Sequence, residues 1–475
     1  MSAAKFLLLA CALTASAFAH VGSPDVFYQG KAGPYTVLIA IRPPDVIPGV
    51  ARVEVRALSA GVESVDLTPT PMIGEASKHP PVADVAQRSA TDPQYFEGTL
   101  WLMGIGSGSW KVRVGVNGAN GPGELQVPVP TLPQKMRPMP QGMTYFLIGM
   151  MIFLTVGMVA VVGAGIRESR LEPGPGATSW SRKTLAAMAT ASILLIGALY
   201  GGNAWWGQEA SAASRRIYKP LEMSASLAPA DRLIVKLTDP GWVIPRKLDD
   251  LALDHGHLMH FFLIQWPEMN HVFHLHPIQA ATGYFETDLP ALPKGTYRLY
   301  GDIVHDSGFA ETAVGEITLP DVQGKPLTGD DAGGLTAPAG TESFPLANGY
   351  RMVWSHDKTK PVAATAVTLF SFAIESPDGK PVSDLEPYMG MGGHAEFVKV
   401  DGSVFAHVHP SGSVSMASEA VASPEAMMGM HQTTIGSAVS FPYGVPTPGH
   451  YRIFVQLKRA GKVETGAFDL TVSQR

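Results

Sequence analysis

A short histidine phrase occurs twice in the C-terminal half of the chain. The two copies read His-Leu-His-Pro from His274 and His-Val-His-Pro from His407. Each copy follows a Val-Phe pair and precedes a second shared phrase, Gly-x-Tyr-Arg, which begins at Gly295 and again at Gly449. Phrases that recur in the same order indicate a duplicated structural unit.

The residues around each phrase favour β-strands, because Val and Phe are common in strands and Pro marks a strand end. Along a strand, residues i and i+2 point to one face, with α-carbons about 6–7 Å apart. Two imidazoles at this spacing can bind one metal ion, whereas a helix would turn them apart. The pattern therefore predicts four core metal ligands: His274, His276, His407 and His409.

Other histidines and methionines lie near both copies and complete the predicted ligand set. These candidates are His257, His260, His305, Met389, Met391, His394, Met430 and His431. Thioether sulfur is a soft ligand that favours Cu(I), while imidazole suits copper and zinc alike. We therefore expect copper, as Cu(I) or Cu(II). We also expect a weaker site in the second copy, because its sequence has no counterparts of His255 and His260.

The N-terminus has the pattern of a secretory signal peptide. Residues 1–19 contain one Lys, an apolar centre and the Ala-x-Ala cleavage pattern. Cleavage after Ala19 would remove Cys11, the only cysteine, so metal ligands must be nitrogen, oxygen or thioether groups. His20 would become the new N-terminus, where its amine and imidazole, joined by His79, could form a copper-binding histidine brace.

Two stretches without charged residues predict transmembrane helices at 143–166 and 184–206. The loop 167–183 contains both Arg and Lys and is expected on the cytoplasmic side. Two pairs of small residues spaced by four, Ala187 with Ala191 and Gly197 with Gly201, favour close packing between the two helices. Together with the signal peptide, this arrangement places both soluble parts outside the cytoplasm.

The remaining chain predicts a mainly β protein of three immunoglobulin-like β-sandwich modules plus the two-helix transmembrane hairpin. Short strand-like runs separated by turn residues are typical of such sandwiches. The net charge of −6, without a basic run, gives no sign of nucleic-acid binding. The expected segments are a first sandwich at 20–130, a Pro-rich linker at 131–142, a second sandwich at 220–323, a linker at 324–342 and a third sandwich at 343–475.

The run from His260 through His274-x-His276-Pro to Gly295-x-Tyr297 and Asp302 resembles the YtkA-like group of bacterial secreted β-sandwich domains. The resemblance extends to both C-terminal modules. The N-terminal module resembles the CopC-like copper-resistance fold more weakly. These resemblances imply an immunoglobulin-like fold, an extracytoplasmic location and copper handling. The Pro-Pro pair that follows His79 departs from the CopC-like pattern.

The leading hypothesis is a membrane-anchored, extracytoplasmic metal-binding protein that buffers or delivers copper and is not an enzyme. It would reside in a bacterial cytoplasmic membrane, with its soluble modules on the periplasmic side and another envelope metalloprotein as a partner. One alternative is a structural or partner-binding envelope protein without metal. Another is a copper or cupin-type metalloenzyme, although a cupin would require a Glu closer to each histidine pair than Glu286 or Glu419.

Overall fold

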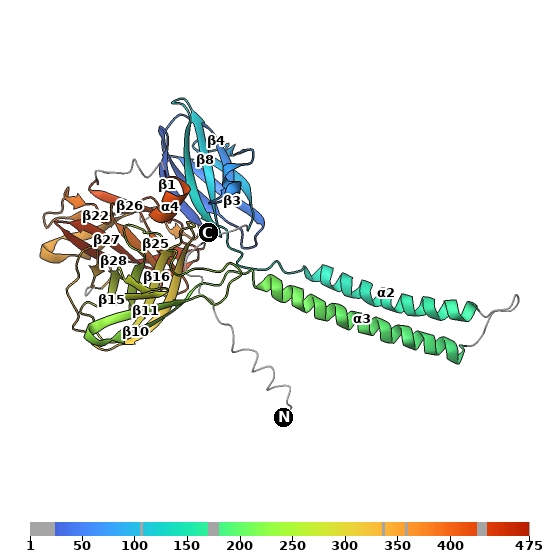
Figure 1. Cartoon of the computed structure of the whole chain (residues 1–475). Coiled ribbons are helices and arrows are strands. Elements are labelled where there is room, and N and C mark those ends of the chain that lie inside the picture. The colour runs from blue at the N-terminus through green and yellow to red at the C-terminus, as the bar shows by residue number, and fades with distance from the viewer. Residues whose placement is uncertain are drawn as a thin grey trace. The chain divides into compact units, whose positions relative to one another are not determined.

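The computed structural model describes residues 24–104, 108–169, 180–334, 338–356, 360–424 and 435–474. These residues form several β-sheets and two long helices, so the prediction of a mainly β protein is confirmed. The chain divides into two compact units (Figure 1). One comprises Met1–Pro133 with Lys219–Arg475, and the other comprises Gln134–Tyr218. The predicted signal peptide lies outside the described residues.

The N-terminal part of the larger unit is a sandwich of two antiparallel sheets, ordered β1-β2-β3-β7-β6 and β5-β4-β8-β9. Strand periodicity builds its core, because Ala51, Val53 and Val55 alternate along β3 and are fully buried. The strands are β1 (Val26–Ala32), β2 (Tyr35–Arg42), β3 (Gly49–Ala57), β4 (Val62–Pro71), β5 (Asp84–Val85), β6 (Gln87–Arg88), β7 (Tyr95–Leu102), β8 (Ser109–Gly118) and β9 (Gly123–Pro130).

The first C-terminal module is one continuous sheet of order β14-β15-β11-β10-β17-β16-β12-β13-β18. Only the β10–β17 pair is parallel, and it joins two antiparallel halves. Leu233 and Phe285 from one half share a core with Phe261 and Leu299 from the other, so the sheet folds over itself. The strands are β10 (Glu222–Ala228), β11 (Arg232–Thr238), β12 (His260–Trp266), β13 (Val272–Leu275), β14 (Ile278–Ala281), β15 (Tyr284–Asp288), β16 (Gly295–Val304), β17 (Ala310–Leu319) and β18 (Ala332–Gly333).

The second C-terminal module has one sheet of order β19-β20-β22-β26 and another of order β21-β28-β27-β24-β25, with β23 beside β27. The run β28-β27-β24-β25 repeats the run β17-β16-β12-β13 of the first module, as expected for a duplicated unit. Its elements are β19 (Ser343–Pro345), β20 (Arg351–Ser355), β21 (Val362–Ala363), β22 (Thr368–Glu375), β23 (Leu385–Glu386), β24 (His394–Lys399), β25 (Phe405–Val408), α4 (Met416–Ala422), β26 (Ala438–Tyr443), β27 (Gly449–Arg459) and β28 (Lys462–Ser473).

The two C-terminal modules pack against each other through these corresponding strands. On β12, Phe261 belongs to the core of the first module, whereas its neighbour Phe262 belongs to a core shared with the second. Tyr300 of β16 stacks on Phe405 of β25, with ring centroids 4.1 Å apart and an interplanar angle of 6°. Because side chains alternate along a strand, His260 lies on the same intermodule face as Phe262.

The smaller unit contains α2 (Gln141–Glu168) and α3 (Arg182–Ser214), which lie side by side (Figure 1). Both helices are long and apolar enough, by length and composition, to cross a membrane. A Cβ on Gly163 would lie 2.6 Å from the Met188 sulfur, which marks a close approach. The predicted packing through Gly197 and Gly201 is wrong, because neither has an atom within 4 Å of a Cβ position.

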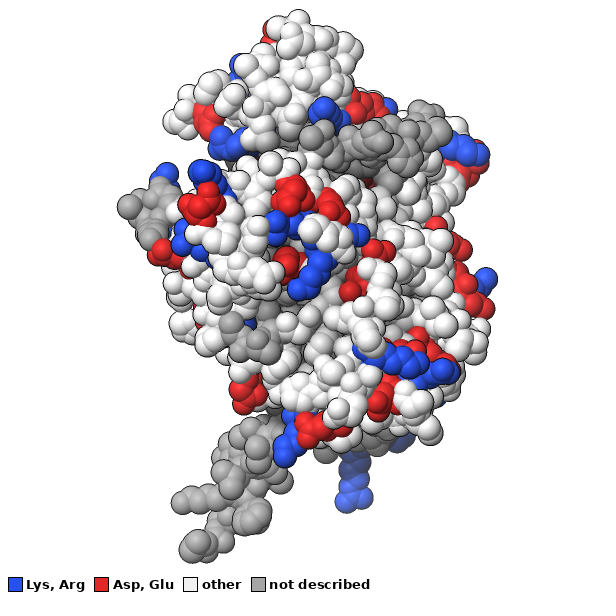
Figure 2. Space-filling view, turned by 90° about the vertical axis from the view of Figure 1, so that its left-hand side faces the viewer, with Lys and Arg blue, Asp and Glu red and all other residues white. Residues whose placement is uncertain are grey.

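Charged side chains on the face shown in Figure 2 are mixed in sign rather than gathered into one acidic or basic area. Ion pairs on the surface of the protein include Arg452 with Asp469 at 2.8 Å and Arg459 with Asp384 at 2.9 Å. Exposed pairs of this kind contribute little to stability, about 0–1 kcal/mol each. The buried polar groups between the modules are therefore better candidates for a functional site than these surface pairs.

Candidate metal centre

Both His-x-His pairs point to the intermodule face, as strand periodicity predicts. The ring centroids of His274 and His276 are 4.6 Å apart, and those of His407 and His409 are also 4.6 Å apart. The two pairs face each other, because His274 and His407 are separated by 5.7 Å. Packing between the modules thus unites the duplicated histidines in one cluster. The cluster contains two triads whose possible ligand atoms lie within 4.8 Å of one another. One is His255, His394 and His409, and the other is His260, His274 and His276.

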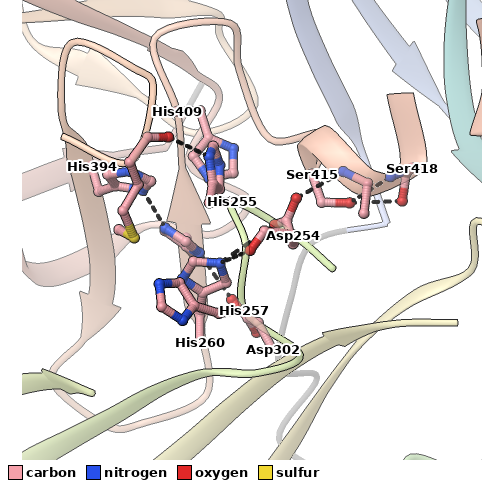
Figure 3. A network of polar contacts seen from close by, with 12 residues as sticks. Asp254, His255, His257, His260, Asp302, His394, His409, Ser415 and Ser418 are labelled. Atoms are coloured by element: carbon pink, nitrogen blue, oxygen red, sulfur yellow. Dashed lines mark hydrogen bonds and ion pairs between the residues drawn. The ribbon is translucent and has the colours of Figure 1, made fainter. Parts of the chain in front are cut away.

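The first triad has three available nitrogens (Figure 3). The Nε2 atoms of His255, His394 and His409 are buried and have no hydrogen-bond partner. The opposite nitrogen of His255 donates to the Met389 carbonyl at 2.7 Å, and that of His409 donates to the Val414 carbonyl at 3.1 Å. Such bonds place the ring proton on Nδ1 and leave Nε2 unprotonated, with its lone pair free, as in many metal-bound histidines.

The third ring of this triad is oriented by another histidine. His394 Nδ1 lies 2.9 Å from His407 Nε2, and His407 Nδ1 lies 3.3 Å from the Asp302 carboxylate. If His407 donates to Asp302, its Nε2 accepts the proton of His394 Nδ1, and His394 Nε2 keeps a lone pair. The first-module residue Asp302 therefore orients a ligand of the second module through His407.

The second triad is organised in a corresponding way. His260 Nδ1 lies 3.0 Å from His274 Nε2, and His274 Nδ1 lies 2.9 Å from the Gln456 side-chain oxygen. His276 Nδ1 donates to Asp331 at 2.9 Å, while its Nε2 has no partner. Gln456 belongs to the second module and orients a first-module ring, which is the reverse of the Asp302 arrangement.

Burial lowers the pKa of several rings in the cluster. Desolvation, followed by the neighbouring imidazoles, holds the pKa values of His260, His394 and His407 well below the ordinary value of 6.5. Burial lowers the pKa of His409 to about 4. Neutral imidazoles are the form that binds metal, so these rings need not lose a proton to an ion at neutral pH.

The turns before β12 and β24 have the same backbone. His255 and Met389 both have positive φ, 54° and 51°, and each precedes a glycine of φ 89° or 80°. Each turn is closed by an isolated bridge, Asp254 to His257 in one and Tyr388 to Met391 in the other. Met389 is therefore the counterpart of His255, and His394, which begins β24, is the counterpart of His260, which begins β12. The expectation that the second copy lacks both counterparts is wrong.

A segment that we call the strap, residues 410–415, connects the first triad to the N-terminal sandwich. Val414, whose carbonyl binds His409, is buried in the core of that sandwich. Ser411 and Ser413 pair with strand β1, through the Gln29 amide at 2.7 Å and the Phe27 carbonyl at 2.9 Å. The strap leads into α4. The Ala417 amide in the first turn of α4 donates a hydrogen bond to Asp254, which lies beside the triad (Figure 3). The N-terminal sandwich therefore helps to position His409.

The other predicted ligands lie at the edge of the cluster or away from it. His257 stacks on His276 at 3.9 Å and contacts Asp330. His305 binds the Asp250 and Glu311 carboxylates through its two nitrogens, at 2.8 and 2.9 Å. Although burial opposes its charge, these carboxylates raise the pKa of His305, as expected for an ion pair rather than a metal ligand.

The N-terminal brace stays a prediction, because His20 lies outside the described residues. His79 is exposed and lies 3.7 Å from Glu75 at the short helix η1 (Glu75–Lys78). Met391 is buried in the turn before β24. Three further candidates, His20, Met430 and His431, lie outside the described residues.

Sequence reasoning missed three residues of the cluster. His255 was not among the predicted ligands, although its His-Gly-His turn aligns with the Met-Gly-Met turn at the same distance from β24. Asp302 and Gln456 also align, because Asp302 pairs with His260 across β12–β16 and Gln456 pairs with His394 across β24–β27. Aligning the two copies strand by strand could have identified all three residues.

A family model described as a domain of unknown function, DUF8832, matches residues 346–474. No curated protein matches the chain. Neither a YtkA-like nor a CopC-like family was matched, so both resemblances remain predictions.

Several solved structures are similar at low identity. Dimeric latent PorU from Porphyromonas gingivalis is 10% identical over 95% of this chain and 34% of its own, with a TM-score of 0.15. Escherichia coli alpha-2-macroglobulin activated by porcine elastase is 10% identical over 95% of this chain and 31% of its own, with a TM-score of 0.17. A putative membrane anchored protein from Corynebacterium diphtheriae is 9% identical over 95% and 96%, with a TM-score of 0.15. The chain spans about a third of the first two, and TM-scores this low assign neither fold nor function.

Proposed function

We propose that this protein is a membrane-anchored, extracytoplasmic copper-binding protein that buffers the metal or delivers it to another envelope metalloprotein. One observation carries the proposal: His255, His394 and His409 bring one ring nitrogen each within 4.8 Å of the others, and the Nε2 atoms of all three are buried without hydrogen-bond partners. An unpaired buried polar atom costs about 1–3 kcal/mol, and a bound ion would offset this cost at three atoms together.

The distances are compatible with coordination. Two nitrogens that bind one ion at about 2.0–2.1 Å in a tetrahedral arrangement lie about 3.3 Å apart. The three ligand atoms are already within 4.8 Å of one another, so small ring rotations would close the site. The hydrogen bonds to the opposite nitrogens would orient the rings during this movement.

Copper is preferred to zinc because a methionine-containing turn joins the same interface. Imidazole binds both metals, while thioether sulfur selects Cu(I). Met389 and Met391 are both buried in this turn, next to the histidine cluster that contains His394. Binding rather than catalysis is proposed because the triad is enclosed: His394 is fully buried and His409 is 2% exposed, which suits an ion better than a bulky substrate.

The anchor and location follow from the sequence pattern. Helices α2 and α3 have the length and apolar composition of membrane spans. The predicted signal peptide would direct both soluble parts across the membrane. In this arrangement the immunoglobulin-like modules would present the copper sites on the periplasmic side.

The test is metal binding by the full-length chain in detergent micelles after treatment with a chelator. Equilibrium dialysis with Cu(II), and with Cu(I) under a reductant, followed by elemental analysis should give two ions per chain. The double variant His394→Ala/His409→Ala should lose one ion, while His450→Ala, at an exposed site, should retain both. Absence of bound metal in the wild type would overturn the proposal and favour the structural or partner-binding alternative.

A further inference from the structure

The equivalent turns at His255 and Met389 each contact the opposite module. The His255 ring belongs to the first module, yet it lies 5.1 Å from the His394 ring and 5.0 Å from the His409 ring of the second. Its counterpart Met389 belongs to the second module and packs in a buried cluster with Ala332 of the first. Ala332 directly follows Asp331, the residue that binds His276. The first turn therefore reaches histidines of the second module, and the second turn contacts the first module beside the residue that holds His276.

The histidines that would receive Met389 are arranged like those that receive His255. The His260 and His276 rings are 5.1 Å apart at 83°, and the His394 and His409 rings are 5.0 Å apart at 87°. In both pairs the second ring has an Nε2 without a partner. The two pairs are thus the same half-site, built once in each module.

The hydrogen bonds of His260 also point to its Nε2 as a ligand. This nitrogen lies 3.1 Å from the Asp254 carbonyl, His260 Nδ1 faces His274, and His274 Nδ1 faces the Gln456 oxygen. The Asp254 and Gln456 oxygens at the two ends can only accept a hydrogen bond, so the three contacts need three protons. Two neutral imidazole rings supply only two. A metal ion on His260 Nε2 would remove the mismatch. Turning the Gln456 amide, so that its NH2 group donates to His274 Nδ1, would also remove the mismatch. The match between the His260–His276 pair and the His394–His409 pair favours the metal ion.

We infer that the thioether of Met389 completes a second metal centre with Nε2 of His260 and Nε2 of His276. The inference rests on the proposed function and makes the two copper sites chemically different. Three imidazoles at the first centre suit Cu(II) as well as Cu(I), whereas two imidazoles and a thioether at the second favour Cu(I). In this arrangement His274 orients His260, just as His407 orients His394, rather than binding the ion.

The experiment measures Cu(I) binding and the copper coordination shell in the full-length chain in detergent. Competition with a chromophoric Cu(I) chelator gives the affinity, and X-ray absorption detects sulfur bound to copper. Met389→Leu should weaken the second ion by at least about 10-fold and remove the sulfur signal, with one ion still bound tightly. Met352→Leu, at a buried methionine in the core of the second module, is the control and should leave both readouts unchanged.

A second variant separates loss of the ligand from loss of structure. Met389→His makes the second turn match the first, so it should keep two ions, lose the sulfur signal and gain affinity for Cu(II). Two bound ions without a sulfur signal in the wild type would overturn the inference while the proposed function stands. Unchanged Cu(I) affinity in Met389→Leu would do the same. A wild type that binds no ion would instead remove the proposed function itself.

Discussion

The two C-terminal modules build the same strands but surround their histidines with different partners. The turn residue is His255 in the first module and Met389 in the second. On the strand that pairs with the central histidine, the first module has Asp302 where the second has Gln456. The two similar half-sites therefore have different residues around them, which makes the two candidate centres unequal.

The modules also differ in how they hold the last histidine of each pair. In the first module the Asp331 side chain accepts from His276, whereas in the second the Val414 backbone carbonyl accepts from His409. A side-chain support can be removed by one substitution. A backbone support depends on the path of the strap and therefore on the N-terminal sandwich to which the strap binds.

Among single substitutions, Gly412→Ala in the strap is expected to produce the largest difference between the two modules. Gly412 has φ of 122°, and a Cβ there would lie 1.9 Å from the Phe27 carbonyl oxygen. The strap must move, so we expect a loss of about 1–3 kcal/mol of stability and at least about 10-fold weaker binding at the first centre only. Thermal unfolding and copper titration measure both quantities.

The control for this variant is Gly461→Ala, because Gly461 has φ of 72° but nothing within 4 Å of its Cβ position. It isolates the cost of the backbone conformation from that of the clash. Equal loss of copper affinity at both centres in Gly412→Ala would contradict the separate support of His409 by the strap.

A smaller effect is expected from Asp331→Ala, which removes the acceptor of His276 Nδ1. Loss of such a partner typically lowers metal affinity by about 10–100-fold. We expect this loss at the second centre, with the first centre unchanged, in stepwise copper titrations. Asp331→Asn, which keeps an oxygen acceptor, should lose less. If Asp331→Ala weakens the first ion instead, the division of ligands between the two centres is wrong.

The smallest effect is a pH dependence at the contact of α4 with the N-terminal sandwich. Glu419 accepts a hydrogen bond from Tyr28, and burial raises the pKa of Glu419 above its ordinary value of 4.5. A raised pKa means that the folded state binds the proton more tightly. The contribution to stability is therefore complete below pH 4.5 and is lost as the pH rises through the raised value.

The variant Glu419→Gln keeps the shape of the side chain but cannot ionise. Its unfolding temperature relative to the wild type should therefore increase as the pH rises from 4.5 towards 8, in metal-free protein. Parallel curves for the two proteins over this range would show that Glu419 does not titrate differently in the folded state.

The predictable part of the site was local. The spacing of His274 and His276, and of His407 and His409, placed each pair on one face of a strand. His260 and His394 were also found, because each stands next to a strand-like run. His305 was predicted as a ligand from its position in the chain, but its two carboxylate partners come from separate segments and could not be identified from that position.

The sequence by itself determined the duplication, the strand faces of the paired histidines and the two long apolar helices, because each depends on the period of a single segment. Only the tertiary structure decided that His255 serves the histidines of the other module and that Asp302 and Gln456 support rings across the interface. These contacts depend on how two folded sheets pack. The free energy of that packing is distributed over many apolar side chains, including Phe262, Tyr300 and Phe405, and no short motif records it.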